Sequence, residues 1–495
     1  MPLLLALGGA PAPTGAPGTN RTLRWFTLGL TTGAVYFAGT LYWIADVLRT
    51  HGSLHAAVAV VVTLALVAYL ALFPALFAVI VGALAERAGP RAVLVAPFIW
   101  VATEYGRGWA LGGFPWVLLG YSQTTVLPVA QLASLVGVYG LSALVSGVAG
   151  AAAFGLLRRG RALVLSVTAA LAVVAVTALW GAQRVADGRL TREGAPVRIG
   201  LIQGNIPQNE KWSEARAAGI FQSYLALSRE AAGRGAEFMM WPESATPFFF
   251  QEDPAGGEAI RGLALETRTT LLFGSDQIEA GSPPRYYNAA FLIDPGGMLV
   301  ATYRKVHLVP FGEYVPFKRL LSFVGPLVES ASDFSPGDEI VLLPVGRHVA
   351  STAICYEIVY PALVRQAVGA GSELLTTITN DAWYGHSSAP HQHFEQAALR
   401  AIEQGRYLAR AANTGISGIV DPYGRVVTRS NLFERTALVG EARFLSGRTL
   451  YGRIGDLAAH LSIVLTVAVA GLLWGTRRRP GYRAGTAAAG VQRGA

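Results

Sequence analysis

Long apolar runs constrain this chain more than any other feature. They lie near residues 25–47, 56–84, 91–110, 127–157, 162–183 and 457–474. Each is long enough to cross about 30 Å of hydrocarbon as a helix. The 495 residues are 52% hydrophobic and only 14% charged, which is too apolar for a chain that buries everything in soluble cores. We therefore expect a polytopic helical membrane bundle of about five spans over residues 1–195, and a further span with a basic cytoplasmic tail over 447–495.

The arginines that flank these runs predict their orientation. The densest basic groups lie at residues 21–24, 87–91, 158–161 and 477–479. These groups fall on alternate sides of successive runs, and loops rich in Lys and Arg stay in the cytoplasm. Residues 184–456 are then expected on the opposite, extracytoplasmic face. The net charge is +9, and its densest arginine groups adjoin apolar runs. We therefore expect membrane lipid as a partner and no nucleic acid.

Polar and aromatic residues near the third run suggest anchoring at the membrane surface. Glu104 and Arg107 are three residues apart, so they predict either an interfacial ion pair or a contact to a lipid headgroup. Trp116 and Tyr121 follow a Gly- and Pro-containing turn and are expected in the aromatic belt at the interface.

The segment 196–446 has the alternating pattern of an α/β domain. Short β-branched runs predict strands near 197–203, 238–241, 270–274, 349–356 and 374–379. Polar, periodic stretches predict helices over 214–232 and 393–412. Such helices would cover the faces of a sheet.

Three predicted strands end in residues that can carry acyl-transfer chemistry. Covalent transfer through a thiol needs a nucleophile, a base and a positive donor for the tetrahedral oxyanion. Cys355 is the only cysteine, while Glu243 and Lys305 supply a carboxylate and an ammonium group. Burial would raise the pKa of Glu243 and a nearby Lys305 would lower it.

These segments resemble the Glu-Lys-Cys signature of the nitrilase superfamily, in order and approximate separation. The resemblance implies an α-β-β-α sandwich over residues 196–446. It also implies that Glu243 is the general base, Lys305 the oxyanion stabiliser and Cys355 the nucleophile. The backbone N–H of Tyr356 would add a second oxyanion donor.

Longer strings are similar to the apolipoprotein N-acyltransferase family. They are Leu308–Pro316, Ile354–Glu357, Asn380–Gly385, Gly113–Trp116 and Gly120–Gln123. The resemblance implies transfer of a fatty acyl group from a phospholipid, through a Cys355 thioester, to the α-amino group of the diacylglyceryl-cysteine of apolipoproteins. It implies the bacterial inner membrane as location. The family usually has eight spans, so those before residue 25 are expected to be missing, with Leu3–Leu7 a remnant.

Further residues have less certain expected roles. The resemblance makes Glu313 and Glu357 supporting residues that position Lys305 and the Cys355 site, with structural ion pairing as the alternative. Residues expected to contact substrate are Phe248, Phe249, Trp383 and Trp116, with Phe250 as a neighbour; core packing is the alternative for the phenylalanines. Segment 323–336 is expected to act as a flap.

Neither a metal nor a cofactor is expected. The histidines His386, His391 and His393 lie close together but have no further ligand pattern, and thiol acyl transfer needs no metal. The chain is expected to be a monomer. Two other functions remain open: a membrane-tethered amidase or nitrilase with water as the final acceptor, and a lipid-binding module without chemistry.

Overall fold

The computed structural model describes residues 1–9, 21–52, 54–314 and 333–477, and side chains as far as residue 473. Its first part is helical. The helices are α1 (Pro2–Gly8), α2 (Arg21–Thr40), α3 (Trp43–Thr50), α4 (Ala56–Ala88), α5 (Ala96–Arg107), α6 (Leu127–Ala130), α7 (Ala133–Arg158) and α8 (Gly160–Asp187). Short 3-10 turns join them: η1 (Gly89–Leu94), η2 (Ala110–Gly112), η3 (Leu119–Gln123) and η4 (Arg189–Thr191). After the second domain, α14 (Leu450–Ile454) leads to α15 (Leu457–Arg477), which returns to pack against α5.

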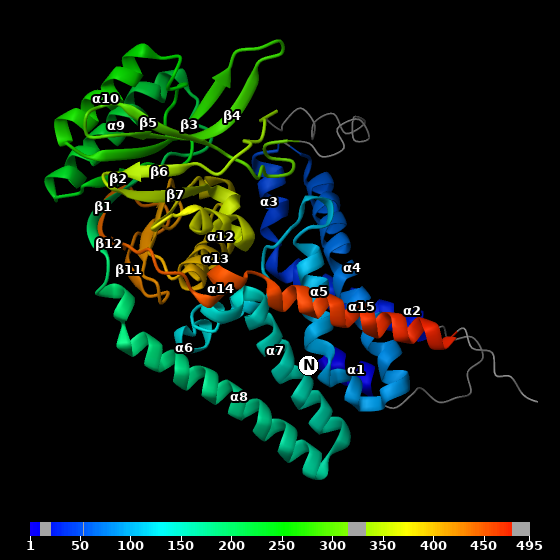
Figure 1. Ribbon diagram of the computed structural model, residues 1–495. Helices are drawn as coiled ribbons and strands as arrows, with labels where there is room; N and C mark the ends of the chain where they lie inside the picture. Colours follow the sequence, from blue (N-terminus) through cyan, green and yellow to red (C-terminus); the bar gives the residue numbers. More distant parts are fainter. Residues whose placement is uncertain (10–20, 53, 315–332, 478–495) are drawn as a thin grey trace, which may run out of the picture.

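Three helices in the described ranges are long and apolar enough to cross a membrane. They are Ala56–Leu94, Ala133–Arg158 and Gly160–Thr191, and the shorter apolar helix Leu457–Leu473 joins them. Helix α8 exposes Leu165 by 69% and Leu179 by 71%, and it stands at the edge of the bundle (Figure 1). Because water would not favour so apolar a surface, lipid is the medium that covers it. The protein is a membrane protein.

The expected span at 91–110 is not one continuous helix. It consists of η1 and the 12-residue α5, which extends over only about 18 Å at 1.5 Å per residue. Glu104 and Arg107 in α5 do not pair with each other, which corrects the expected interfacial ion pair. Instead Glu104 accepts from Leu119 N–H at 2.7 Å, and Arg107 donates to the carbonyls of Phe114 and Trp116 at 2.9 and 2.8 Å. Side chains of α5 thus satisfy backbone groups of the segment that follows it.

Two six-stranded sheets form the second part. The first sheet has the order β12-β1-β2-β3-β4-β5, and the second β11-β10-β9-β8-β7-β6. The first contains β1 (Ala195–Gln203), β2 (Phe238–Met240), β3 (Thr270–Glu279), β4 (Arg285–Ile293), β5 (Leu299–Arg304) and β12 (Thr436–Phe444). The second contains β6 (Leu342–Val345), β7 (His348–Ile354), β8 (Leu374–Thr379), β9 (Leu408–Ala412), β10 (Gly418–Val420) and β11 (Val426–Arg429).

Helices cover the outer face of each sheet, so the domain is the expected α-β-β-α sandwich (Figure 1). Helices α9 (Glu214–Gly233) and α10 (Pro254–Thr267) lie on the first sheet, while α12 (Pro361–Ala370) and α13 (Ala389–Gln404) lie on the second. One apolar core, including Leu201 and Ile354, fills the space between the sheets. The expected helix 393–412 is wrong in its second half, because Gly405 ends α13 in a left-handed conformation and β9 follows.

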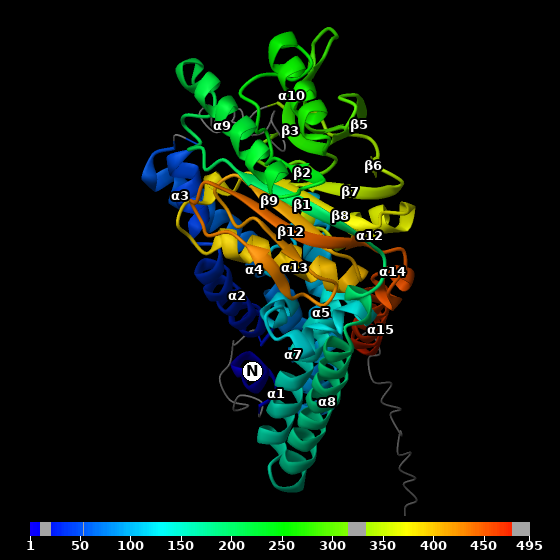
Figure 2. The same cartoon turned by 90° about the vertical axis from the view of Figure 1, so that its left-hand side faces the viewer.

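Helix α13 joins this domain to the bundle. It lies between the second sheet and the membrane helices (Figure 2). Gln392 donates to Thr40 O at 3.1 Å and accepts from Trp116 Nε1 at 2.8 Å. Glu403 accepts from Val138 N–H at 2.8 Å, beside the non-helical Gly137 within α7. The contacts between the two domains are therefore partly polar and directional.

Candidate active site

Cys355 stands at a sharp turn directly after β7. Its φ is +53°, a left-handed conformation that is uncommon for a residue with a side chain, and η5 (Cys355–Val359) begins there. The side chain is buried. Burial first, and the negative charge of Glu243 second, raise the pKa of the Cys355 thiol well above its usual range, although Lys305 lowers it. The thiol is therefore neutral at rest and needs a base.

Glu243 follows β2 and is buried at the same edge. Its Oε1 accepts from Asn288 at 2.7 Å and from Lys305 Nζ at 3.3 Å, and its Oε2 accepts from Asn380 N–H at 2.9 Å. Burial raises the pKa of Glu243, but Lys305, Asn288 and Lys211 together bring it below its ordinary value. The competing effects anticipated from the sequence are both present. Glu243 is ionised and able to accept a proton.

Lys305 follows β5 and is 1% exposed. Its Nζ donates to Glu313 Oε1 at 2.8 Å as well as to Glu243. Burial lowers the pKa of Lys305, but the two carboxylates outweigh it and hold that pKa above its usual range. A permanent ammonium group therefore lies near the thiol, where it can stabilise a developing oxyanion.

Two polar residues that the sequence analysis missed complete this cluster. Asn288, from the middle of β4, bridges Glu243 and Glu313 through Nδ2. Lys211 is buried and donates to the Glu243 carbonyl at 3.1 Å. A lone Asn in a strand, or a Lys in the loop after β1, carries no signal without knowledge of how the strands pair.

Glu357 supports the site without contacting the Lys305 ammonium. It is fully buried and accepts from the backbone N–H groups of Val306, His307 and Ile354 at 2.7, 3.0 and 2.7 Å, and from the Tyr303 hydroxyl. These donors come from the segments next to Lys305 and next to Cys355. Glu357 makes no ion pair within the described ranges, so ion pairing, its alternative role, is wrong. Burial raises the pKa of Glu357 to about 7 despite these donors.

A second buried network lies behind the nucleophile. His393 Nε2 is 3.1 Å from the Cys355 carbonyl oxygen, and Nδ1 is 3.0 Å from Asp381 Oδ1. Arg410 donates to Asp381 Oδ2 at 2.8 Å. Among the described residues no group of three potential metal ligands occurs, and His386 stacks on Phe433 instead. From the sequence alone, a metal ligand is the only functional role that His393 suggests.

The aromatic residues of the site come from both domains. Trp116 is 1% exposed and stacks on Tyr356 at 6.0 Å between ring centroids, so its expected place in an interfacial belt is wrong. Tyr121 is also buried, which corrects the same expectation for it. Trp383 is 39% exposed and contacts the His51 ring of α3.

The phenylalanine run lies against the outer layer of the first sheet. Phe250 is buried and packs on Phe273 and Phe291, so it is a core residue. Phe248 is half-buried, and its ring meets that of Phe221 at 5.1 Å, which favours packing over substrate contact. Phe249 is half-buried, and its contact with substrate stays a prediction. Residues 323–332 of the expected flap lie outside the described residues.

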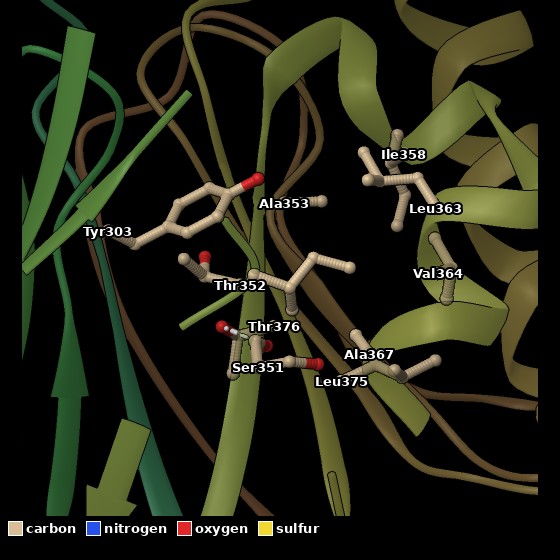
Figure 3. Close-up of a pocket in the computed structure, with 11 residues that line it drawn as sticks. Tyr303, Ser351, Thr352, Ala353, Ile358, Leu363, Val364, Ala367, Leu375 and Thr376 are labelled. Atoms are coloured by element: carbon tan, nitrogen blue, oxygen red, sulfur yellow. Dashed lines mark hydrogen bonds between the residues drawn. The ribbon is translucent and has the colours of Figure 1, made fainter. Parts of the chain in front are cut away.

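A cavity that is distinct from this site lies between the second sheet and α12 (Figure 3). It is a small cavity of about 20 Å³, lined by Tyr303, Thr352 and Val364 among others. Cys355, Glu243 and Lys305 do not line it. The cavity is therefore no entrance to the thiol.

Two family models match the two parts of the chain. Residues 3–151 match the "Apolipoprotein N-acyltransferase N-terminal domain" family, and residues 198–444 match the "Carbon-nitrogen hydrolase" family. The apolipoprotein N-acyltransferase of Geobacter metallireducens is 42% identical over 92% of this chain and 88% of its own. That of Methylococcus capsulatus is 36% identical over 88% and 84%. A solved amidase from Nesterenkonia sp. is 21% identical with a TM-score of 0.40, covering 54% of this chain and 97% of its own.

Proposed function

The chain belongs to the apolipoprotein N-acyltransferase family, and from that membership we propose that Cys355 carries a fatty acyl group from a phospholipid to the α-amino group of a diacylglyceryl-cysteine. The protein is an acyltransferase. The observation that carries the proposal is the junction at the nucleophile: Trp116, from the membrane bundle, stacks on Tyr356, the residue that follows Cys355. A thiol so close to membrane helices suits a donor that resides in lipid.

In the first half-reaction the thiol proton passes to the Glu243 carboxylate as sulfur attacks the ester carbonyl carbon of the donor. A C–S bond forms, and the carbonyl oxygen takes the electron pair. Lys305 Nζ and the Tyr356 N–H are placed to stabilise this oxyanion. Collapse of this tetrahedral intermediate breaks the C–O bond to the lysophospholipid. Glu243 returns the proton to the departing lysophospholipid oxygen, which leaves a thioester on Cys355.

The second half-reaction uses the same groups in the same order. The neutral α-amine of the apolipoprotein attacks the thioester carbon, and Glu243 accepts the amine proton. When the tetrahedral intermediate collapses, an amide forms and the C–S bond breaks. Glu243 then reprotonates the thiolate. No external energy source is needed, because the net reaction converts an ester into a more stable amide.

The arrangement in the membrane is part of the proposal. Residues 196–446 form the catalytic unit, with 1–195 as the amino-terminal bundle and 447–495 as the final span and tail. The arginine groups that flank the helices support a catalytic unit on the periplasmic face of the inner membrane. The protein acts as a monomer, and its donor is a phospholipid of the surrounding bilayer.

Intact-mass measurement tests the proposal. The detergent-purified protein is incubated with a defined phospholipid, with and without neutral hydroxylamine, beside Cys355→Ser. The expected result is a hydroxylamine-labile gain of one acyl chain, absent from the variant, that moves to an added diacylated lipopeptide. Parallel double-reciprocal lines are expected for the two substrates. No adduct, together with ammonia release from amides, would overturn the proposal and favour a tethered amidase.

A further inference from the structure

We propose that His393 is a positioning residue that sets the direction of the Tyr356 N–H, the backbone donor for the oxyanion. It acts through the peptide group that joins Cys355 to Tyr356. This inference rests on the proposed function, because the oxyanion arises only in acyl transfer.

The contact between His393 and the nucleophile is specific. Its Nε2 lies 3.1 Å from the Cys355 carbonyl oxygen, and the imidazole is fully buried. A carbonyl oxygen can only accept a hydrogen bond, so Nε2 carries the proton in this contact. His393 does not touch the thiol itself in any described contact. Its effect on the reaction must therefore pass through the backbone.

The geometry of the peptide bond carries that effect. The Cys355 C=O and the Tyr356 N–H belong to one planar trans unit, so they point in opposite directions. Fixing the oxygen on the His393 side therefore fixes the N–H on the other side. Tyr356 lies in the first turn of η5, where N–H groups have no acceptor within the helix. Its N–H is thus available to a ligand.

The peptide after Cys355 needs a contact that fixes its orientation. A non-glycine residue at φ +53° is held against a cost of about 1 kcal/mol or more. Rotation of the following peptide, about ψ of Cys355 and φ of Tyr356, would swing the N–H away from the oxyanion. The His393 bond opposes that rotation. A histidine that only filled core space would not need to meet this one carbonyl.

The imidazole is itself held in place. With the proton on Nε2, the unprotonated Nδ1 accepts a hydrogen bond from Arg410 at 3.1 Å. Arg410 and Thr379 also donate to the two oxygens of Asp381 at 2.8 and 3.0 Å. All four side chains are buried. There is little room for Asp381 to move, since a Cβ at Gly415 would lie only 2.2 Å from its Oδ2.

The same segment also holds the base. Asn380, next to Asp381, donates its N–H to Glu243 Oε2 at 2.9 Å. Residues 379–381 therefore position the base directly and the oxyanion donor through His393. This connection accounts for the three buried charged or polar side chains around His393.

Two reactions of the same thiol test the inference. Acylation by phospholipid passes through an oxyanion, whereas alkylation by iodoacetamide forms a C–S bond with loss of iodide and without one. The variants are His393→Leu, without a donor, His393→Gln, whose amide reaches the Nε2 position, and His393→Asn, which reaches only the Nδ1 position. The exposed neighbour His391→Leu is the matched control. Single-turnover thioester formation and alkylation rates are measured, with thermal unfolding for each protein.

We expect His393→Leu and His393→Asn to form the thioester about 10²-fold more slowly, the effect of losing one oxyanion donor, with alkylation within about threefold of wild type. His393→Gln should recover to within about tenfold. Equal loss of both reactions, or unchanged acylation in His393→Leu, would overturn the inference. If the leucine variant does not fold, equal acylation by the Gln and Asn variants would overturn it. Failure of the wild type to form an adduct would count against the proposed function instead.

Discussion

Replacement of Glu357 by Gln tests whether one buried carboxylate organises both halves of the site. Oε1 accepts from Val306 and His307, Oε2 accepts from Ile354, and the Tyr303 hydroxyl lies 2.9 and 3.0 Å from the two oxygens. The amide of Gln can replace Oε2 at least cost, where its NH₂ would face the Ile354 N–H. That leaves one buried donor unpaired, at about 1–3 kcal/mol. Loss of the charge adds no further cost, because burial already raises the pKa of this carboxyl to about 7.

This loss, on the order of 2 kcal/mol, corresponds to a fall in Tm on the order of 5 °C for a domain of this size. Thermal unfolding in detergent measures it, with exposed Glu441→Gln as a control expected within about 0.5 kcal/mol of wild type. Because the lost contacts adjoin Lys305 and Cys355, thioester formation should also slow by about 10²-fold. A variant that melts and acylates like the wild type would refute this account of Glu357.

Three further changes give contrasting outcomes. Lys305→Met should reduce thioester formation by about 10²-fold or more. It should also cost about 3–5 kcal/mol of stability, since two buried carboxylates lose their cation. A variant that forms as much adduct as the wild type would contradict this prediction. Burial raises the pKa of Asp276 from 3.8 to about 6, so the stability that its protonated form contributes is complete below pH 3.8 and is lost as pH rises through 6. The stability of Asp276→Asn should therefore rise relative to wild type by up to about 3 kcal/mol between pH 4 and 7. A constant Tm difference between the two proteins over that range would contradict this prediction. Gly137→Ala should lower Tm by several degrees, because Gly137 has a φ of +68° and the new Cβ would lie 2.5 Å from the Tyr451 ring. Gly219→Ala is the control, since its Cβ would enter open space and should not lower Tm. Equal Tm values for the two variants would show that α7 adapts.

The sequence predicted the parts of this molecule that depend on local patterns. Strand periodicity placed β1, β2, β3, β7 and β8, and the residues at strand ends included Glu243, Lys305 and Cys355. Asn288 could not be found this way, because its contact with Glu243 depends on how β4 aligns with its neighbours.

The junction between the domains was equally hidden from the sequence. Tryptophan is a residue type that often anchors proteins at the membrane interface. The ring of Trp116 nevertheless packs on Tyr356, 240 residues later in the chain. His393 lies in a cluster of histidines, and only the approach of α13 to the turn at Cys355 gives it a partner. Both depend on tertiary packing, to which hydropathy and motif spacing are insensitive.

Helix α13 has a kinetic consequence for this protein. Since Gln392 and Glu403 bind the bundle while His393 binds the nucleophile's carbonyl, the thiol is held at one height relative to the membrane helices and cannot swing freely on a tether. Under the proposed function, a site held in this way would meet lipid-borne reactants by lateral diffusion, a search in two dimensions. Its turnover should then follow the mole fraction of donor in a micelle or bilayer, and added inert detergent should slow it by surface dilution even at constant bulk donor concentration.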